Sequence, residues 1–312
     1  VLSMTFHTDG RDYDVYVELM SNEGVLEVKY NDIKEFLQPG KIVDDGCGDG
    51  ALLMRVSEDF SDSKLVGVDL SKEMILRAYK REERGDYGDA DIDFTISDVQ
   101  SDFEDVGKAD SVIASSICHE IWSYENGEED LQNYFNSKYR QLKENGRLII
   151  RDVIGPFEKN KTVWAWFNDE NGFNTGALTL SENSELQEMH LDSLSTLARF
   201  KRFLRDFYMR DLTDRLSEFE ERLYREDDAS QTPLFKVNKD IAVEYMLTKD
   251  YTDNWMNEMR EEFTFWTPQH YEEALEEAGF EVIHRDVYTN EWIEENRFEG
   301  KAELYEEIGM VL

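Results

Sequence analysis

Residues 41–50 read Lys-Ile-Val-Asp-Asp-Gly-Cys-Gly-Asp-Gly, and this stretch decides the fold. A short apolar run ends in acids and is followed by glycines at alternate positions, Gly46, Gly48 and Gly50. A second apolar run, residues 65–69, ends in another acid. Glycines let the backbone pass close to a ligand and aim N–H groups at it, and an acid at a strand tip can accept both ribose hydroxyls. The pattern therefore predicts a βαβ unit that cradles a nucleotide.

The bulk composition is that of a folded chain. It has 312 residues, of which 40% are hydrophobic and 12% aromatic, so we expect a compact fold rather than disorder. The sequence contains no run of about 18 apolar residues and no charged-then-apolar export signal at its start. Two isolated cysteines, Cys47 and Cys118, make neither a disulfide framework nor a metal cluster. We therefore expect a cytoplasmic protein without a membrane span.

The net charge is strongly negative, because 70 acids face 34 lysines and arginines and give −36. The acids are spread along the whole chain, which suits a surface adapted to high salt. An ordinary acidic cytoplasmic protein is the alternative interpretation. Either way, such a field repels polyanions and disfavours nucleic acid as a partner, although molar salt would screen this repulsion.

Strands and helices alternate from residue 41 onward. We predict strands over residues 41–45, 65–69, 92–96, 109–115 and 147–153, with helices after Gly50, from Ser71 and over about 129–142. This rhythm predicts an α/β fold with a doubly wound, mostly parallel sheet and helices on both faces. Two later segments, 280–288 and 301–305, are predicted as the sixth and seventh strands, and the helix between Pro268 and Gly279 precedes them.

The rhythm breaks in the middle of the chain. Residues 191–224 carry apolar side chains at intervals of three and four, a helical pattern, and we interpret 157–262 as a helical insertion that acts as a lid or a dimer contact. Its aromatic residues are interpreted as a packing core rather than a ligand cage. The predicted parts are a helical lead-in over 1–40, a nucleotide-binding core over 41–156, the insertion over 157–262 and a return to the core sheet over 263–312. In the lead-in, Tyr13 and Tyr16 are residues that could fold over a ligand.

Several segments resemble the class I S-adenosylmethionine (SAM)-dependent methyltransferases in order and spacing. The segments are the glycine stretch 42–50, the strand end and helix 67–75, Ser97-Asp98-Val99, the strand and turn 109–120, the helix-turn-strand unit 142–152 and the late segment 267–282. The glycine spacing differs from the Gly-x-Gly-x-x-Gly of NAD-dependent oxidoreductases, which were the rival enzyme class. Asp45 departs from the family pattern, since its position is usually apolar. We expect its side chain to face a polar partner at the pocket, and a mere family variation is the alternative.

The resemblance implies a set of SAM-binding residues. Asp44, Gly46, Gly48, Gly50 and Ser115 would lie at the methionine half, Asp69 would take the ribose hydroxyls, Asp98 the adenine amino group, and Leu70 and Val99 the faces of the adenine ring. Methyl transfer from a sulfonium is an in-line displacement, in which the protein aligns the two reactants and excludes water.

Where the acceptor must lose a proton, a base near the end of the fourth strand would serve. His119 is the first candidate, because imidazole titrates in the useful range, and a histidine that merely caps the loop is the alternative. Asp152 is the second candidate, and Tyr124 would shape the acceptor pocket. Neighbouring side chains usually diverge, so we do not expect His119 and Glu120 to bind a metal, and the other histidines are scattered.

The sequence thus predicts a SAM-dependent methyltransferase with a small-molecule acceptor, and a homodimer is one option that it leaves open. A SAM-binding regulatory module without turnover and an RNA methyltransferase are the alternatives. Saturable SAM binding without turnover would favour the first, and salt-dependent association with RNA would favour the second.

Overall fold

The computed structural model describes residues 23–101, 106–124, 126–174, 191–207, 212, 234–289, 291–307 and 310–311. The chain folds as two compact units. The described residues up to Val153, together with Tyr271–Ile283, form the core unit, and those of Ile154–His270 and His284–Leu312 form the second unit. The predicted contribution of Tyr13 and Tyr16 lies outside the described residues.

The core unit is built on a parallel sheet of five strands in the order β3-β2-β1-β4-β5. The strands are β1 (Lys41–Asp45), β2 (Lys64–Asp69), β3 (Asp91–Ile96), β4 (Ala109–Ser115) and β5 (Leu142–Arg151). Val43 of β1 pairs with Val66 on one side and Val112 on the other, and all three are buried. This confirms the predicted α/β fold with a parallel sheet, whose strand ends meet at one edge.

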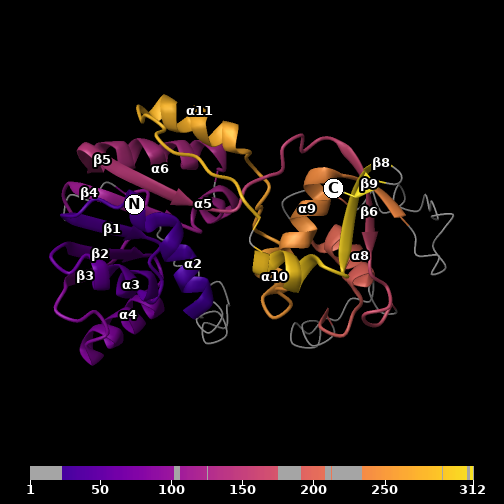
Figure 1. Cartoon of the computed structure of the whole chain (residues 1–312), viewed down its shortest axis with the longest axis horizontal. Helices are drawn as coiled ribbons and strands as arrows, with labels where there is room; N and C mark the ends of the chain where they lie inside the picture. The colour runs from indigo at the N-terminus through magenta and orange to yellow at the C-terminus, as the bar shows by residue number, and fades with distance from the viewer. Residues whose placement is uncertain are drawn as a thin grey trace, which may run out of the picture. The chain divides into compact units, whose positions relative to one another are not determined.

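Helices cover both faces of this sheet (Figure 1). The helices α2 (Glu23–Ile33), α3 (Ala51–Asp59) and α4 (Lys72–Arg84) share one apolar core with the sheet, and the 3₁₀ turn η1 (Lys34–Phe36) follows α2. The helices α5 (Cys118–Tyr124), α6 (Glu128–Gln141) and α11 (Pro268–Ala278) belong to the other face. As predicted, Ser71 caps the start of α4, and its hydroxyl accepts the N–H of Met74 at 3.3 Å.

The prediction of a sixth strand over residues 280–288 is wrong, because this described segment forms no strand. The backbone N–H of Phe280 donates to Leu275 O and closes α11 at Gly279, whose φ is +102°. The following residues are mostly exposed, with Ile283 64% accessible to solvent. A strand needs a partner and a buried face, and this segment has an exposed surface instead.

The second unit contains its own antiparallel sheet of four strands in the order β7-β6-β8-β9, which corrects the prediction of a mostly helical insertion without strands. The strands are β6 (Thr162–Phe167), β7 (Leu234–Asn238), β8 (Ala302–Glu307) and β9 (Met310–Val311). The predicted seventh strand is thus present as β8, but it pairs with β6 instead of the core sheet. The signal missed was the alternation of Val163, Ala165 and Phe167, all buried, with half-buried tryptophans between them.

Among the described residues of the second unit, the helices are α8 (Thr196–Asp206), α9 (Lys239–Thr248), α10 (Trp255–Glu258), α12 (Glu291–Ile293) and the π-helix η3 (Glu294–Phe298). Residues of α8, α9 and α10 share one apolar core with β6 and β7. Phe167 lies 4.3 Å from Phe200 and 5.2 Å from Tyr245 between ring centroids. Trp255 is fully buried in the same cluster, which supports the interpretation of Phe167 and Trp255 as parts of a packing core, whereas Phe173 is 65% exposed. Among the described helices, none has the length and apolar character needed to cross a bilayer.

Candidate active site

The glycine loop joins β1 to α3 at the carboxyl edge of the core sheet. Gly46, Gly48 and Gly50 have φ values of +72°, +54° and +76°, a region that side chains rarely adopt. The N–H groups of Gly46 and Cys47 donate to Val68 O at 2.8 and 3.0 Å, which ties the loop to the end of β2. A Cβ on Gly46 would lie 2.4 Å from Cδ1 of Ile117, which follows β4. Position 46 therefore needs a glycine, because any side chain there would clash with Ile117.

Asp69 links two elements of this edge. Its Oδ2 accepts the N–H of Gly48 at 2.8 Å, and its Oδ1 accepts the N–H of Ser71 at 2.8 Å. The carboxylate therefore joins the glycine loop to the start of α4. Each carboxylate oxygen has a second lone pair, so the group can still accept ligand hydroxyls.

Asp44 is 2% exposed at the end of β1. Burial, together with the charges of Asp45 and Asp69, raises its pKa to about 8, and Lys29 opposes this shift. An acid in this environment gains most from a cationic ligand, because the ligand's charge would stabilise its ionised form.

The ends of β2 and β3 carry apolar side chains that are open to solvent. Leu70 is 54% and Ile96 43% exposed, while Val99 is buried. Oδ1 of Asp98 accepts the N–H of Gln100 at 2.9 Å, a local turn that fixes this acid beyond β3. Leu70, Asp98 and Val99 are the positions predicted to frame the adenine ring, and Ile96 was not among them.

Asp45 has a polar partner, as expected, but the partner lies in the interior. Its Oδ2 accepts from Nζ of Lys138 at 2.8 Å and from the hydroxyl of Tyr134 at 3.0 Å, both from α6. Burial raises the pKa of Asp45, and Lys138 and Tyr134 oppose this shift.

His119 and Asp152 were predicted separately, and the structure brings them together. Nδ1 of His119, at the start of α5, lies 2.7 Å from Oδ1 of Asp152, just beyond β5. The other oxygen of Asp152 accepts the N–H groups of Cys118 and His119 at 2.7 and 3.3 Å. Burial alone would raise the pKa of Asp152, but the His119 ring and the N–H groups of Val153 and Cys118 together lower it. An ionised Asp152 only accepts, so it selects the His119 tautomer with the proton on Nδ1.

Ser115 and Ser116 end β4 beside this pair. Ser116 has a φ of +60° and its N–H donates to Arg151 O at 2.7 Å, so the turn into α5 is held in an unusual conformation. Tyr124 ends α5 and is 42% exposed. Five residues along a helix turn a side chain by about 140°, so Tyr124 points away from the His119 face.

Sequence reasoning missed one charged residue of this edge, Lys29 on α2. Burial and Arg151 lower its pKa, whereas Asp44, Asp152 and Glu120 raise it. Lys29 therefore lies within electrostatic range of the site's acids. The signal was present, because Lys29 adjoins the buried face of α2 formed by Leu26, Tyr30 and Ile33.

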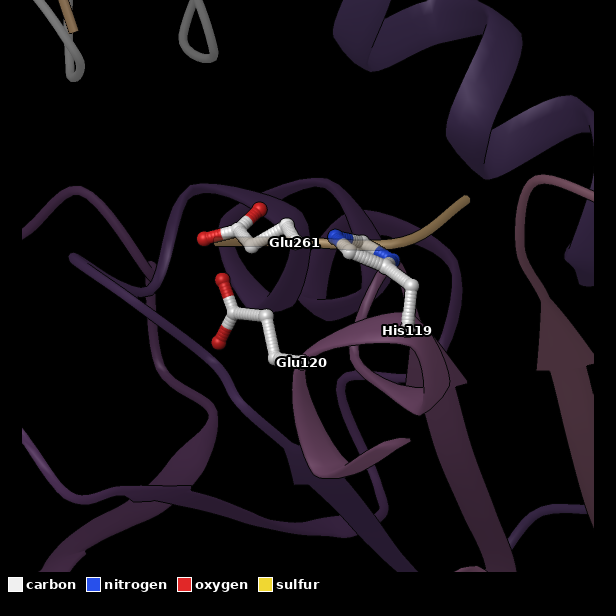
Figure 2. A group of neighbouring side chains, drawn as sticks. All are labelled: His119, Glu120 and Glu261. Atoms are coloured by element: carbon white, nitrogen blue, oxygen red, sulfur yellow. The ribbon is translucent and has the colours of Figure 1, made fainter. Parts of the chain in front are cut away.

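Figure 2 shows His119 and Glu120 side by side on α5, and their ligand atoms lie within 4.8 Å of each other. Glu261, also drawn there, belongs to the second unit. The two α5 side chains approach more closely than expected for neighbours in sequence. Structural zinc sites take four protein ligands and catalytic ones three, so this pair by itself does not make a metal centre.

Comparison with known proteins identifies the fold family. A family described as a methyltransferase domain matches residues 38–202, slightly more than half of the chain. The protein belongs to this family, the class I SAM-dependent methyltransferases, which confirms the resemblance predicted from the sequence.

Solved structures show similarity over part of the chain. Streptomyces venezuelae DesVI is 22% identical over 49% of this chain and 62% of its own, with a TM-score of 0.38. The glycopeptide N-methyltransferase MtfA is 16% identical over 44% of this chain and 58% of its own, with a TM-score of 0.36. The PH0226 protein from Pyrococcus horikoshii OT3 is 27% identical over 45% of this chain and 54% of its own, with a TM-score of 0.31. In each case the chain spans less than two thirds of the structure that it matches.

The residues present fit SAM. Exposed Leu70 and Ile96 offer apolar surface for an adenine ring, and Asp44 and Asp69 supply carboxylates for an ammonium and a ribose. Oγ of Ser115 is buried without a hydrogen-bond partner, which leaves a polar atom at the end of β4 for a ligand to satisfy.

Proposed function

We propose that this protein transfers a methyl group from SAM to a small-molecule acceptor, with His119 as the base that removes the acceptor's proton. The observation that carries the proposal is the 2.7 Å contact between His119 and Asp152 at the strand edge that also holds the glycine loop. A base placed there lies where open parallel sheets bind ligands.

SAM, when bound, supplies a methyl group on a positively charged sulfur, which is reactive without activation by the protein. The chain's own residues then have three tasks. Asp44 would hold the ammonium group, Asp69 the ribose hydroxyls and Asp98 the adenine amino group, and Leu70 and Val99 would pack against the ring. These contacts would hold the cofactor in one orientation, so its translational and rotational entropy would be lost on binding and not in the chemical step.

His119 would act through Nε2. Asp152 holds the Nδ1 proton and stabilises the imidazolium that forms when Nε2 takes a proton from the acceptor's nucleophilic atom. Because the ring is buried, with 8% of the side chain accessible, little water competes for that proton.

A small-molecule acceptor is supported by the charge of −36, which opposes the approach of a polyanion at low salt. Residues 157–262 as a lid or dimer contact, a cytoplasmic location and adaptation to high salt stay predictions.

The decisive experiment is calorimetric titration of SAM and, separately, NAD into wild-type protein and Asp69→Ala, in low and in molar salt. Saturable SAM binding that Asp69→Ala weakens supports the proposal, and its absence in both salts contradicts it. An acceptor panel of amines, phenols, carboxylates and RNA would follow, with formation of S-adenosylhomocysteine as the readout. Binding without turnover on the whole panel would favour the regulatory module, and turnover on RNA alone would replace the small-molecule acceptor.

A further inference from the structure

The glycine loop is preceded by a buried ion pair. Asp45 ends β1 and Lys138 lies on α6, both side chains are 0% exposed, and Nζ lies 2.8 Å from Oδ2.

Further polar groups of α6 contact this pair. The hydroxyl of Tyr134 donates to the same Oδ2 of Asp45 at 3.0 Å, and Nζ of Lys138 donates to Oε1 of Gln141 at 3.0 Å. Nζ of Lys138 also lies 5.2 Å from the Tyr134 ring centroid. Positions 134, 138 and 141 are four and three residues apart, so one face of α6 presents all three side chains to the end of β1.

Stability alone does not explain this pair. Removing two charges from water is costly, and apolar replacements of similar volume often leave a protein equally or more stable. The position of the pair is more informative, because Asp45 lies between Asp44 and Gly46. Successive side chains of a strand point to opposite faces, so Asp45 anchors one face while Asp44 is presented on the other.

We propose that Asp45 and Lys138 are positioning residues that fix the end of β1 against α6 and thereby hold Asp44 and the glycine loop in the geometry that receives the methionine half of SAM. The inference rests on the proposed use of SAM. Asp45 is the last β1 residue in register with both β2 and β4, at Val68 and Ala114. Beyond it the chain must enter the left-handed turn at Gly46, so a shift of its end would displace the loop's N–H groups.

The test compares two double variants. Asp45→Val/Lys138→Met replaces the ion pair by apolar side chains, whereas Asp45→Asn/Lys138→Gln removes the charges but keeps hydrogen-bonding groups. Both are checked for folding by circular dichroism and thermal unfolding, and SAM binding is measured by calorimetry. The apolar variant is expected to unfold at or above the wild-type temperature and yet bind SAM about tenfold more weakly. The polar variant is expected to stay within about threefold of wild type, because it retains the tether.

The matched control is Arg202→Met, which removes the cation of a buried ion pair with Asp206 in the second unit and should leave SAM affinity unchanged. A folded apolar variant with wild-type affinity would overturn the inference alone, and absence of SAM binding to the wild type would overturn both the inference and the proposed function. Should the apolar variant not fold, Tyr134→Phe removes one donor to Asp45 and keeps the ion pair. It is then expected to weaken SAM binding about threefold, and unchanged affinity would overturn the inference.

Discussion

Nδ1 of His119 lies 2.7 Å from Oδ1 of Asp152, although the two residues are 33 positions apart in the chain. The contact follows from topology, because β4 and β5 are adjacent parallel strands whose carboxyl ends meet at the same edge. A buried histidine with an ionised carboxylate on one nitrogen has its other nitrogen as the basic atom. The pair therefore has the geometry of an oriented base.

Substitution of either member should slow methyl transfer. His119→Gln removes the base and should lower kcat by about 10²- to 10⁴-fold, and Asp152→Asn should have a smaller effect in the same direction, because it leaves the ring in place but selects the wrong tautomer. The rate of S-adenosylhomocysteine formation with an acceptor from the panel measures both.

The same variants should bind SAM normally, since neither residue is assigned a cofactor contact. His284→Gln, at an exposed position, is the matched histidine control and should change neither rate nor affinity. Wild-type rates in His119→Gln would show that the histidine only caps the turn into α5.

Asp69 should govern SAM affinity. Asp69→Asn loses charged acceptors for the ribose and for the N–H groups of Gly48 and Ser71, so we expect binding weakened by about 10- to 100-fold in calorimetry. The control is Asp91→Asn, a change at the amino end of the neighbouring strand β3. Equal losses in both variants would indicate a general effect of charge rather than a contact at the carboxyl edge.

Asp44 should make stability depend on pH. Its pKa is about 8 in the folded chain, against 3.8 for the ordinary group, so the folded state keeps a proton that the unfolded state releases between these values. Stability therefore falls as pH rises through this window. Relative to Asp44→Asn, the wild-type free energy of unfolding should fall by about 3 kcal/mol between pH 5 and pH 8. Denaturant titrations of both proteins at the two pH values measure the difference, and a constant difference would contradict it.

The same carboxyl should release its proton when SAM binds, because the ammonium group favours the ionised form. SAM affinity should rise from pH 6 to pH 8 in the wild type. Calorimetry in buffers of different ionisation enthalpy detects the released proton, and Asp44→Asn should release less.

The core unit could be predicted because its signals are local. The apolar runs that became β1 and β4 end at the predicted residues, and Ser71 and Gly279 mark helix ends as expected. The second unit was harder, because β6 pairs with β8, which lies far along the chain. In β6 the residues between the buried positions are tryptophans, which are apolar and also occur in packed helices. The alternation of apolar and polar residues is therefore weak, and the period of two was missed.

The candidate site was predictable in its parts but not in its contacts. The glycine spacing and the strand-tip acids can be identified within single segments. Lys29 and Lys138 lie on helices α2 and α6, and a lysine on a helix is ordinarily predicted to face solvent. A buried lysine is identified only by its partner, and the partner of Lys138 lies on another element. Sequence therefore predicted that Asp45 needs a polar partner, but could not say which one.

A last prediction concerns the second unit, where Glu244 of α9 is fully buried. Its carboxylate accepts the N–H of Phe263 at 3.0 Å and both the N–H and the hydroxyl of Thr264, at 2.8 and 2.6 Å. Burial raises its pKa to about 7 despite these donors. Glu244→Ala would leave the donors buried without an acceptor, so we expect a loss of about 3 kcal/mol at pH 5. Because the raised pKa weakens the carboxyl's contribution between pH 4.5 and 7, the loss should shrink by about 2 kcal/mol at pH 8.

Chemical denaturation at both pH values measures this loss, with Glu295→Ala, an exposed acid of η3, as the control that should stay within about 0.5 kcal/mol of wild type. A loss that stays constant between the two pH values would mean that Glu244 is ionised throughout and acts as an ordinary charged acceptor. A loss that shrinks would show that the loop at 263–264 is held by a carboxyl that changes charge near neutral pH, independently of the core unit's acids.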